Sequence, residues 1–214
     1  MAQRLLLYTR FERFWHWAQA ALVFALAATG FEVHGSWSLV GFEKAALWHN
    51  TLAWALVVLV VFAVFWHFTT GTWMQYLPTR HHIKEMLRYY LVGIFENEPH
   101  PTKKTELSKL NPLQRVTYFG LKILVFPVQI ISGFAYYFRD DLAAAGIAAP
   151  IGPIAFTHTL AAFLLLLFII AHVYLTTTGR TASSNIRAMI TGWEETGEDG
   201  QSGGPRTGES GQES

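Results

Sequence analysis

Two histidines, His158 and His172, lie fourteen residues apart in one uncharged apolar stretch of the chain. At about 100° per residue, this spacing comes within about 40° of four whole turns, so on a helix both imidazoles would leave the same face, about 21 Å apart along the axis. Polar groups are rare inside a membrane, and those found there usually serve a function. The spacing therefore predicts two imidazole sites at different depths of one membrane helix.

Two further histidines have similar surroundings. His16 lies in the segment RFWHWAQAALVF and His49 in ALWHNTLAWALVV. Imidazole is a common metal ligand and holds haem iron in many proteins, so four histidines can supply two bis-imidazole haem irons. The chain contains no cysteine, which excludes thiolate-bound iron–sulfur clusters, disulfides and covalent haem attachment. We therefore expect two non-covalent b-type haems.

The elements that must position these histidines are apolar segments long enough to cross a bilayer. The 214-residue chain is 51% hydrophobic and 14% charged, and four segments of about 20 apolar residues can each span the hydrocarbon core. They are residues 14–31, 47–68, 116–138 and 154–177, with Trp and Tyr near their ends as in an aromatic belt. The predicted fold is an all-α membrane protein, a four-transmembrane-helix bundle over residues 14–178 that binds two haems b.

Basic residues predict how this bundle is oriented, because Lys and Arg stay on the cytoplasmic side of short connections. They precede the first span, lie between the second and third, and follow the fourth, with one basic residue in each of the other two connections. Both termini are therefore predicted to be cytoplasmic, including residues 1–13 and the juxtamembrane segment 179–195. At these depths His16 and His172 would ligate an inner haem, and His49 and His158 an outer haem.

Other interpretations of the histidines remain. His67 is a competing inner ligand, because eighteen residues from His49 is five full turns of helix. A histidine near the end of a span can also hydrogen-bond a neighbouring helix, in which case the chain would be a haem-free structural anchor for a peripheral redox enzyme. A transporter ranks third, because the four spans contain no acidic residue. The weaker ligand candidates are His34, His81, His82 and His100.

The long cytoplasmic connection and the C-terminal end have patterns of their own. Over residues 81–95, apolar residues recur at spacings of three and four with Lys84, Glu85 and Arg88 opposite, which predicts a short interfacial helix. Residues 196–214 are rich in glycine, serine and acidic residues and are predicted to be a disordered tail.

Polar residues also gather where the third span begins. Asn111 as N-cap, Pro112 at the first helical position and Gln114 at the third form a helix-start signal. A polar cluster at the inner surface beside a haem could also bind a quinone headgroup, and the two roles are compatible. Further along, Lys122 is expected to snorkel to the interface, with a haem propionate as its alternative partner. Gly120 and Gly133 would allow close approach of a helix or porphyrin.

Over about residues 4–193 the chain resembles the cytochrome b (gamma) subunit of respiratory formate dehydrogenases and related thiosulfate-reductase-like and hydrogenase-type cytochromes. The resemblance is carried by His-Trp in the first span, a histidine opening the second, Asn-x-x-Gln-Arg before the third and His-x13-His in the fourth. It implies the same ligand pairs, His16 with His172 and His49 with His158. It also implies a menaquinone site by the inner haem at Asn111, flanked by Gln114 and His172.

These observations predict a di-haem cytochrome b subunit of a respiratory oxidoreductase complex, multi-pass in a bacterial inner membrane. An outer-face redox subunit, expected to be an iron–sulfur protein, would exchange electrons with the outer haem, and menaquinone or ubiquinone would react near the inner haem. Identical residues would serve either direction of electron flow. A separate subunit would act on the primary substrate, and the other expected partner is membrane lipid, not nucleic acid.

Overall fold

The computed structural model describes residues 3–79, 83–93, 96, 98, 109–148, 150–179 and 181–196. They belong to two compact units. The four-helix unit contains the described residues of Phe11–Met74 and Gly120–Phe168, and the sheet unit contains those of Met1–Arg10, Gln75–Phe119 and Ile169–Ser214. His81, His82, His100 and residues 197–214 of the expected tail lie outside the described residues.

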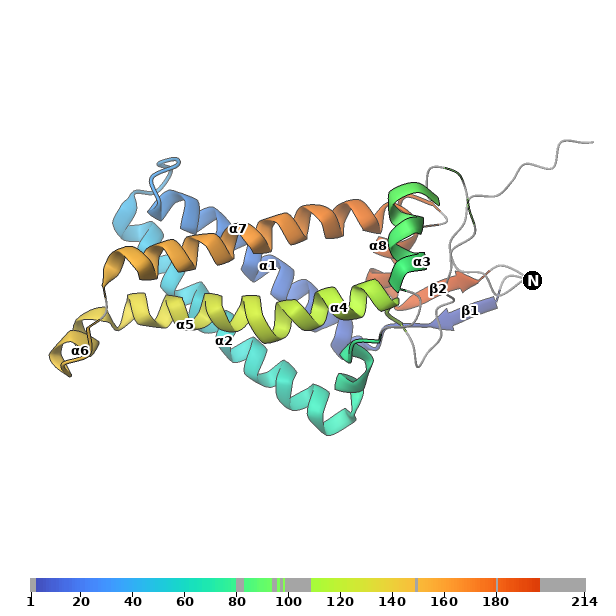
Figure 1. Ribbon diagram of the computed structural model, residues 1–214, viewed down its shortest axis with the longest axis horizontal. Coiled ribbons are helices and arrows are strands. Elements are labelled where there is room, and N and C mark those ends of the chain that lie inside the picture. Colours follow the sequence, from blue (N-terminus) through green and yellow to red (C-terminus); the bar gives the residue numbers. More distant parts are fainter. Residues whose placement is uncertain are drawn as a thin grey trace, which may run out of the picture. The chain divides into compact units, whose positions relative to one another are not determined.

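Long helices dominate the chain (Figure 1). Three of them are long and apolar enough to cross a membrane: Phe42–Thr70, Pro112–Tyr137 and Ile151–Thr176. The first is α2 and the last is α7, whereas the middle one combines α4 (Pro112–Gly120), a π-helical turn η3 (Leu121–Val125) and α5 (Phe126–Tyr137). The predicted spans 47–68, 116–138 and 154–177 are thus confirmed as apolar helices of sufficient length.

The first predicted span also forms a helix, α1 (Arg10–Val33). Its 24 residues would cover about 36 Å, enough to cross a bilayer core. Among the described residues it is not one of the three helices that are both long and apolar enough to cross a membrane, because His16, Gln19 and the tryptophans beside His16 lower its mean hydropathy. A membrane crossing by α1 therefore remains a prediction.

Aromatic side chains connect the helices of the four-helix unit. Phe11 of α1 packs on Trp66 of α2 with ring centroids 4.2 Å apart. Trp54 of α2 meets Phe134 of α5 at 5.1 Å, and Phe31 and Phe163 join α1 to α7 at 6.1 Å. Many other apolar side chains are exposed, including Val58, Phe65, Phe156 and Leu167, each more than 60% exposed. Such a surface suits contact with lipid.

The carboxylate of Glu32 holds the connection between α1 and α2 through hydrogen bonds. Oε1 of the buried Glu32 accepts backbone hydrogen bonds from Leu39, Val40 and Gly41 at 2.7–2.8 Å. Gly41 precedes α2 with a φ of 89°, a conformation that favours glycine. Desolvation raises the pKa of Glu32, but the three N–H donors outweigh it, so its pKa lies below the ordinary value. The charged side chain thereby fixes where α2 begins.

The sheet unit contains two short strands that the sequence analysis did not predict. β1 (Gln3–Leu6) pairs antiparallel with β2 (Trp193–Thr196), so that Leu6 lies opposite Trp193 (Figure 1). The preceding helix α8 (Ser184–Thr191) ends at Gly192, whose φ is 90° and whose carbonyl accepts the N–H of Leu7 at 2.8 Å. Each strand is four residues long, so the period-two pattern has too few residues to be recognised.

The described part of the predicted interfacial segment is helical, and its position at the membrane surface stays a prediction. It consists of α3 (Ile83–Arg88) followed by a π-helical turn η2 (Tyr89–Gly93). Met86 and Tyr89 are buried, whereas Lys84, Glu85 and Arg88 are exposed, as expected for an amphipathic helix. The remaining short elements are a 3₁₀ helix η1 (Thr72–Tyr76) and α6 (Arg139–Ala144).

Candidate functional site

His49 is held by α1 through its Nδ1 atom. This nitrogen lies 3.0 Å from Oγ1 of Thr29, which in turn donates to the carbonyl of Ala25 at 2.9 Å. The next residue of α1, Gly30, lies against the same ring: a Cβ placed there would be 3.2 Å from Cε1 of His49. A threonine and a glycine of one helix therefore fix the imidazole of the next.

His158 has the same kind of surroundings, supplied by α5. Its Nδ1 lies 3.1 Å from Oγ of Ser132 and 3.2 Å from the carbonyl of Gln129. Ser132 donates to the carbonyl of Val128 at 2.6 Å. A Cβ on Gly133 would be 3.1 Å from Cε1 of His158, so this glycine permits the close approach to α5.

The two imidazoles face each other inside the four-helix unit. Their ring centroids are 6.3 Å apart and their planes cross at 75°. This separation is of the size that two imidazoles sharing one metal ion would need, because a metal–nitrogen bond is about 2 Å long. The Nδ1 atoms are taken by Thr29 and Ser132, leaving Nε2 as the ligand atom of each ring. The pair His49/His158 thus fits bis-imidazole ligation.

Gln129 of α5 adds a polar group to this site. Its Nε2 lies 3.1 Å from Nε2 of His158, so the amide must turn aside when a metal takes that nitrogen. Its Oε1 is buried and has no hydrogen-bond partner among the residues that the structure describes. A buried carbonyl oxygen of this kind is costly unless it gains a partner, which is consistent with a site that receives a further group.

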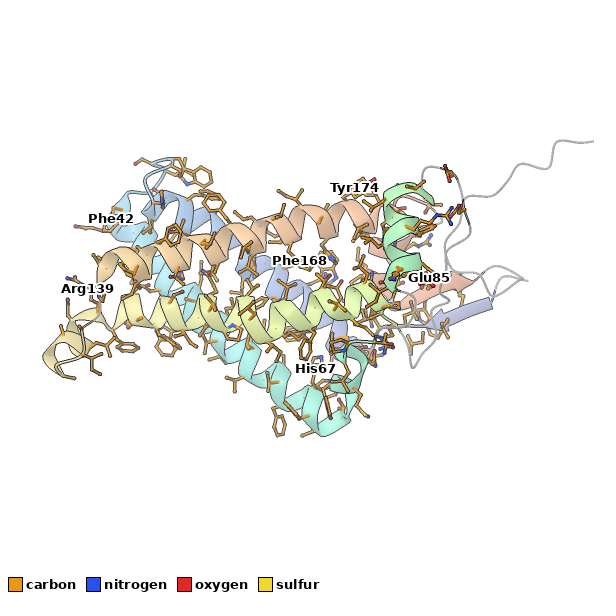
Figure 2. The ribbon with its side chains drawn as sticks, in the orientation of Figure 1. Phe42, His67, Glu85, Arg139, Phe168 and Tyr174 are labelled. Carbon is orange, nitrogen blue, oxygen red and sulfur yellow. The ribbon has the colours of Figure 1, made fainter. Side chains whose placement is uncertain are left out.

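The other predicted ligands of the four-helix unit lie away from this pair in sequence. His16 is on α1, and His67, labelled in Figure 2, is near the end of α2. Nδ1 of the buried His67 bonds the carbonyl of Ala63 at 2.6 Å, and its ring packs edge-on against Trp15 with centroids 5.3 Å apart. The ammonium of Lys122 lies over the same Trp15 ring at 5.5 Å. This contact is a cation–π interaction; snorkelling and propionate binding by Lys122 stay predictions.

The remaining predicted residues lie in the sheet unit. His172 is on α7, and the hydroxyl of Tyr118 on α4 lies 3.5 Å from its Nδ1. The helix-start prediction is confirmed: Gln114 N–H donates to Oδ1 of Asn111 at 2.8 Å, and Asn111 N–H donates to Oε1 of Gln114 at 3.0 Å. These two reciprocal bonds form a capping box at the start of α4.

Tyr90 extends this polar cluster from η2. The amide Nδ2 of Asn111 donates to the Tyr90 hydroxyl at 2.9 Å. Burial raises the pKa of Tyr90 above its ordinary value, although the bond from Asn111 works in the opposite direction. The hydroxyl therefore keeps its proton at neutral pH. In the capping box, the side-chain carbonyl oxygens of Asn111 and Gln114 each accept a backbone N–H. The side-chain amide N–H groups of Gln114 take no part in these two bonds.

The sequence analysis named the histidines and Gly133 but not their supporting residues. It missed Thr29, Gly30, Gln129 and Ser132. The signal that could have indicated three of them is a hydroxyl residue followed by glycine within an apolar span, which occurs at Thr29–Gly30 and at Ser132–Gly133. Gly120, which it grouped with Gly133, has no atom of the described residues within 4 Å of a Cβ position.

Comparison with known proteins decides the class of this chain. Residues 7–192 match the family model described as prokaryotic cytochrome b561. The chain belongs to this family. It is also 30% identical over 201 residues to the Escherichia coli protein named "Putative cytochrome YdhU", with 89% of this chain and 75% of that protein covered. Haem b binding, membrane location and electron transport therefore apply to this cytochrome, and the haem-free anchor is disfavoured.

Proposed function

We propose that this membrane cytochrome b561 carries two haems b and relays electrons between an outer-face redox subunit and a quinone in a bacterial respiratory complex. The observation that carries the proposal is the opposed pair His49/His158, with ring centroids 6.3 Å apart. A bound haem b supplies one-electron transfer. The role of the protein is to hold that group in a dry, apolar bundle and to set its surroundings.

The outer haem is assigned to His49 and His158. Each histidine presents Nε2 for ligation because a hydroxyl oxygen holds its Nδ1, an arrangement common to metal-binding histidines. Gly30 and Gly133 remove the side chains that would otherwise press on the rings. Haem in this site would lie on the side of the membrane opposite the predicted cytoplasmic termini.

The inner haem is assigned to His16 and His172. Support comes from the matching depths that the sequence predicts and from α7, which is one helix from Ile151 to Thr176 and carries both His158 and His172. His67 remains the alternative inner ligand, because its ring nitrogen Nδ1 is also fixed by an acceptor, the carbonyl of Ala63. Single replacement of each histidine distinguishes the two assignments.

The quinone site is assigned to the start of α4. The sequence predicts that this point and His172 lie at similar depths, near the inner face of the membrane. Asn111, Gln114 and Tyr90 form one hydrogen-bonded cluster there. In this site the Gln114 amide would donate to a quinone carbonyl, and the capping box would keep that amide in place. Menaquinone and ubiquinone both present such carbonyls.

The partner is expected to dock on the outer face and to be an iron–sulfur subunit of a formate-dehydrogenase-like complex, which would act on the primary substrate. Purification of the tagged chain from native membranes, with haem and iron determination, tests this assignment. Co-purification of an iron–sulfur subunit, with two haems b per copy of this chain, is the expected result. A chain that purifies alone under mild detergent, with no iron beyond that of its haem, would contradict it.

A further inference from the structure

The four-helix unit contains the same small motif twice. Thr29 and Gly30 on α1 face His49, and Ser132 and Gly133 on α5 face His158. In each case the hydroxyl oxygen lies 3.0–3.1 Å from Nδ1. The glycine that follows lies against Cε1 of the same ring. We call Thr29–Gly30 and Ser132–Gly133 the hydroxyl–glycine pairs.

Each hydroxyl in these pairs is placed to accept a hydrogen bond from its histidine. A hydroxyl has one hydrogen, and that of Thr29 points to the helix carbonyls of Ala25 and Leu26 at 2.9 and 3.2 Å. The Ser132 hydrogen points to the carbonyls of Val128 and Gln129 at 2.6 and 3.2 Å. In this arrangement the hydrogen between the hydroxyl oxygen and Nδ1 is supplied by the imidazole.

We propose that Thr29 and Ser132 are positioning residues that hold His49 and His158 as neutral Nδ1–H tautomers and thereby tune the reduction potential of the outer haem. This inference rests on the proposed ligand role of the two histidines. A neutral hydroxyl whose hydrogen already bonds a carbonyl is a moderate acceptor, which polarises the imidazole less than a carboxylate would. The ligands thus keep their neutral character.

The consequence for the haem has a definite sign. An acceptor on Nδ1–H makes the imidazole a more basic ligand, and a more basic ligand favours oxidised iron. Removing the acceptor should favour reduced iron and shift the potential of that haem to more positive values. The carbonyl of Gln129 also lies 3.2 Å from Nδ1 of His158, and His49 has a backbone hydrogen-bond contact with Leu26. We therefore expect a partial shift from each single substitution and a larger one from both.

Redox potentiometry of the haem-loaded protein tests the inference. Thr29→Val keeps the side-chain shape and removes the hydroxyl. Ser132→Ala removes the hydroxyl of the second pair and leaves a smaller side chain, whereas Thr29→Ser retains the acceptor. Thr51→Val is the matched control, because Thr51 is a threonine of α2 whose hydroxyl bonds the carbonyl of Leu47 at 2.8 Å and is exposed. The valine and alanine variants at the two pairs should shift the potential of one haem positively, with wild-type haem content.

The outcomes separate the two proposals. Thr29→Ser and Thr51→Val should have the wild-type potential, because both keep the acceptor on His49. If Thr29→Val and Ser132→Ala also retain it while His49→Ala loses one haem, the hydroxyl inference is overturned and the ligand assignment stands. If His49→Ala keeps both haems, the ligand assignment itself is overturned. A shift in Thr29→Ser equal to that in Thr29→Val would show a steric cause and would likewise overturn the inference.

Discussion

Adding one methyl group at Gly133 should cost this protein its outer haem without harming the helix. A Cβ at this position would be 3.1 Å from Cε1 of His158, whereas ordinary contacts begin at 3.4 Å. The imidazole or α5 must therefore move by at least about 0.3 Å, the difference between these distances. Metal–ligand bonds tolerate about 0.2 Å, so the displacement is larger than the bond can absorb.

The expected size follows from related perturbations. Disturbing the groups that orient a ligand costs about 10–100-fold in metal affinity, whereas Gly→Ala in a helix interior favours the helix by about 0.5–1 kcal/mol. Haem per chain, measured as the pyridine haemochrome of purified Gly133→Ala, should fall from two toward one. Because alanine favours the helix, the thermal stability of the helices, followed by circular dichroism, should not fall.

Two further variants make this prediction sharp. Gly30→Ala should have the same effect through His49, because its Cβ would be 3.2 Å from Cε1 of that ring. Gly152→Ala is the control, since no atom of the described residues lies within 4 Å of its Cβ position. Wild-type haem content and potentials in both Gly30→Ala and Gly133→Ala would refute the view that these glycines make room for the ligand pair.

Three other perturbations have definite outcomes. Redox titration should show that His16→Ala and His172→Ala each lose the same inner haem, whereas His67→Ala should keep both haems. Loss of a haem in His67→Ala would mean that His67, and not His16 or His172, is one of the two inner ligands. Gln114→Glu keeps an acceptor for the Asn111 N–H but removes the amide donor. Quinone reduction should therefore slow about fivefold, the factor that corresponds to one hydrogen bond of about 1 kcal/mol. An unchanged rate would argue against the quinone site. The pKa of Glu32 is lowered on folding, so the stability that its charged form contributes is present above the unfolded pKa and is lost as pH falls through the folded pKa. Thermal melts should show a loss of stability at acid pH in the wild type that Glu32→Gln lacks. Identical pH profiles of the two proteins would contradict this role.

The sequence predicted the larger elements of the fold because apolar length is a strong signal. The spans 47–68, 116–138 and 154–177 correspond to helices, and the capping residues Asn111 and Gln114 make the bonds expected of them. The paired strands β1 and β2 escaped prediction because they pair across almost the whole length of the chain. Such pairing depends on tertiary structure rather than on local pattern.

The sequence pointed to the histidines of the candidate site but not to the residues that support them. A histidine in an apolar span is conspicuous, and His49 and His158 come together as the topology suggested. Thr29 and Ser132 look ordinary in sequence, because a hydroxyl in an apolar helix usually bonds its own backbone. Their importance comes from the neighbouring helix against which they pack, which no spacing within one helix reveals.

The most direct test of the account is the haem content and redox titration of His49→Ala and His158→Ala beside the wild type. The account predicts two b haems in the wild type and one in each variant. The haem that remains should have the same potential and spectrum in both, because the account assigns the two histidines to one iron. Retention of two haems by either folded variant, or loss of a different haem in each, would contradict the assignment of His49 and His158 as a pair.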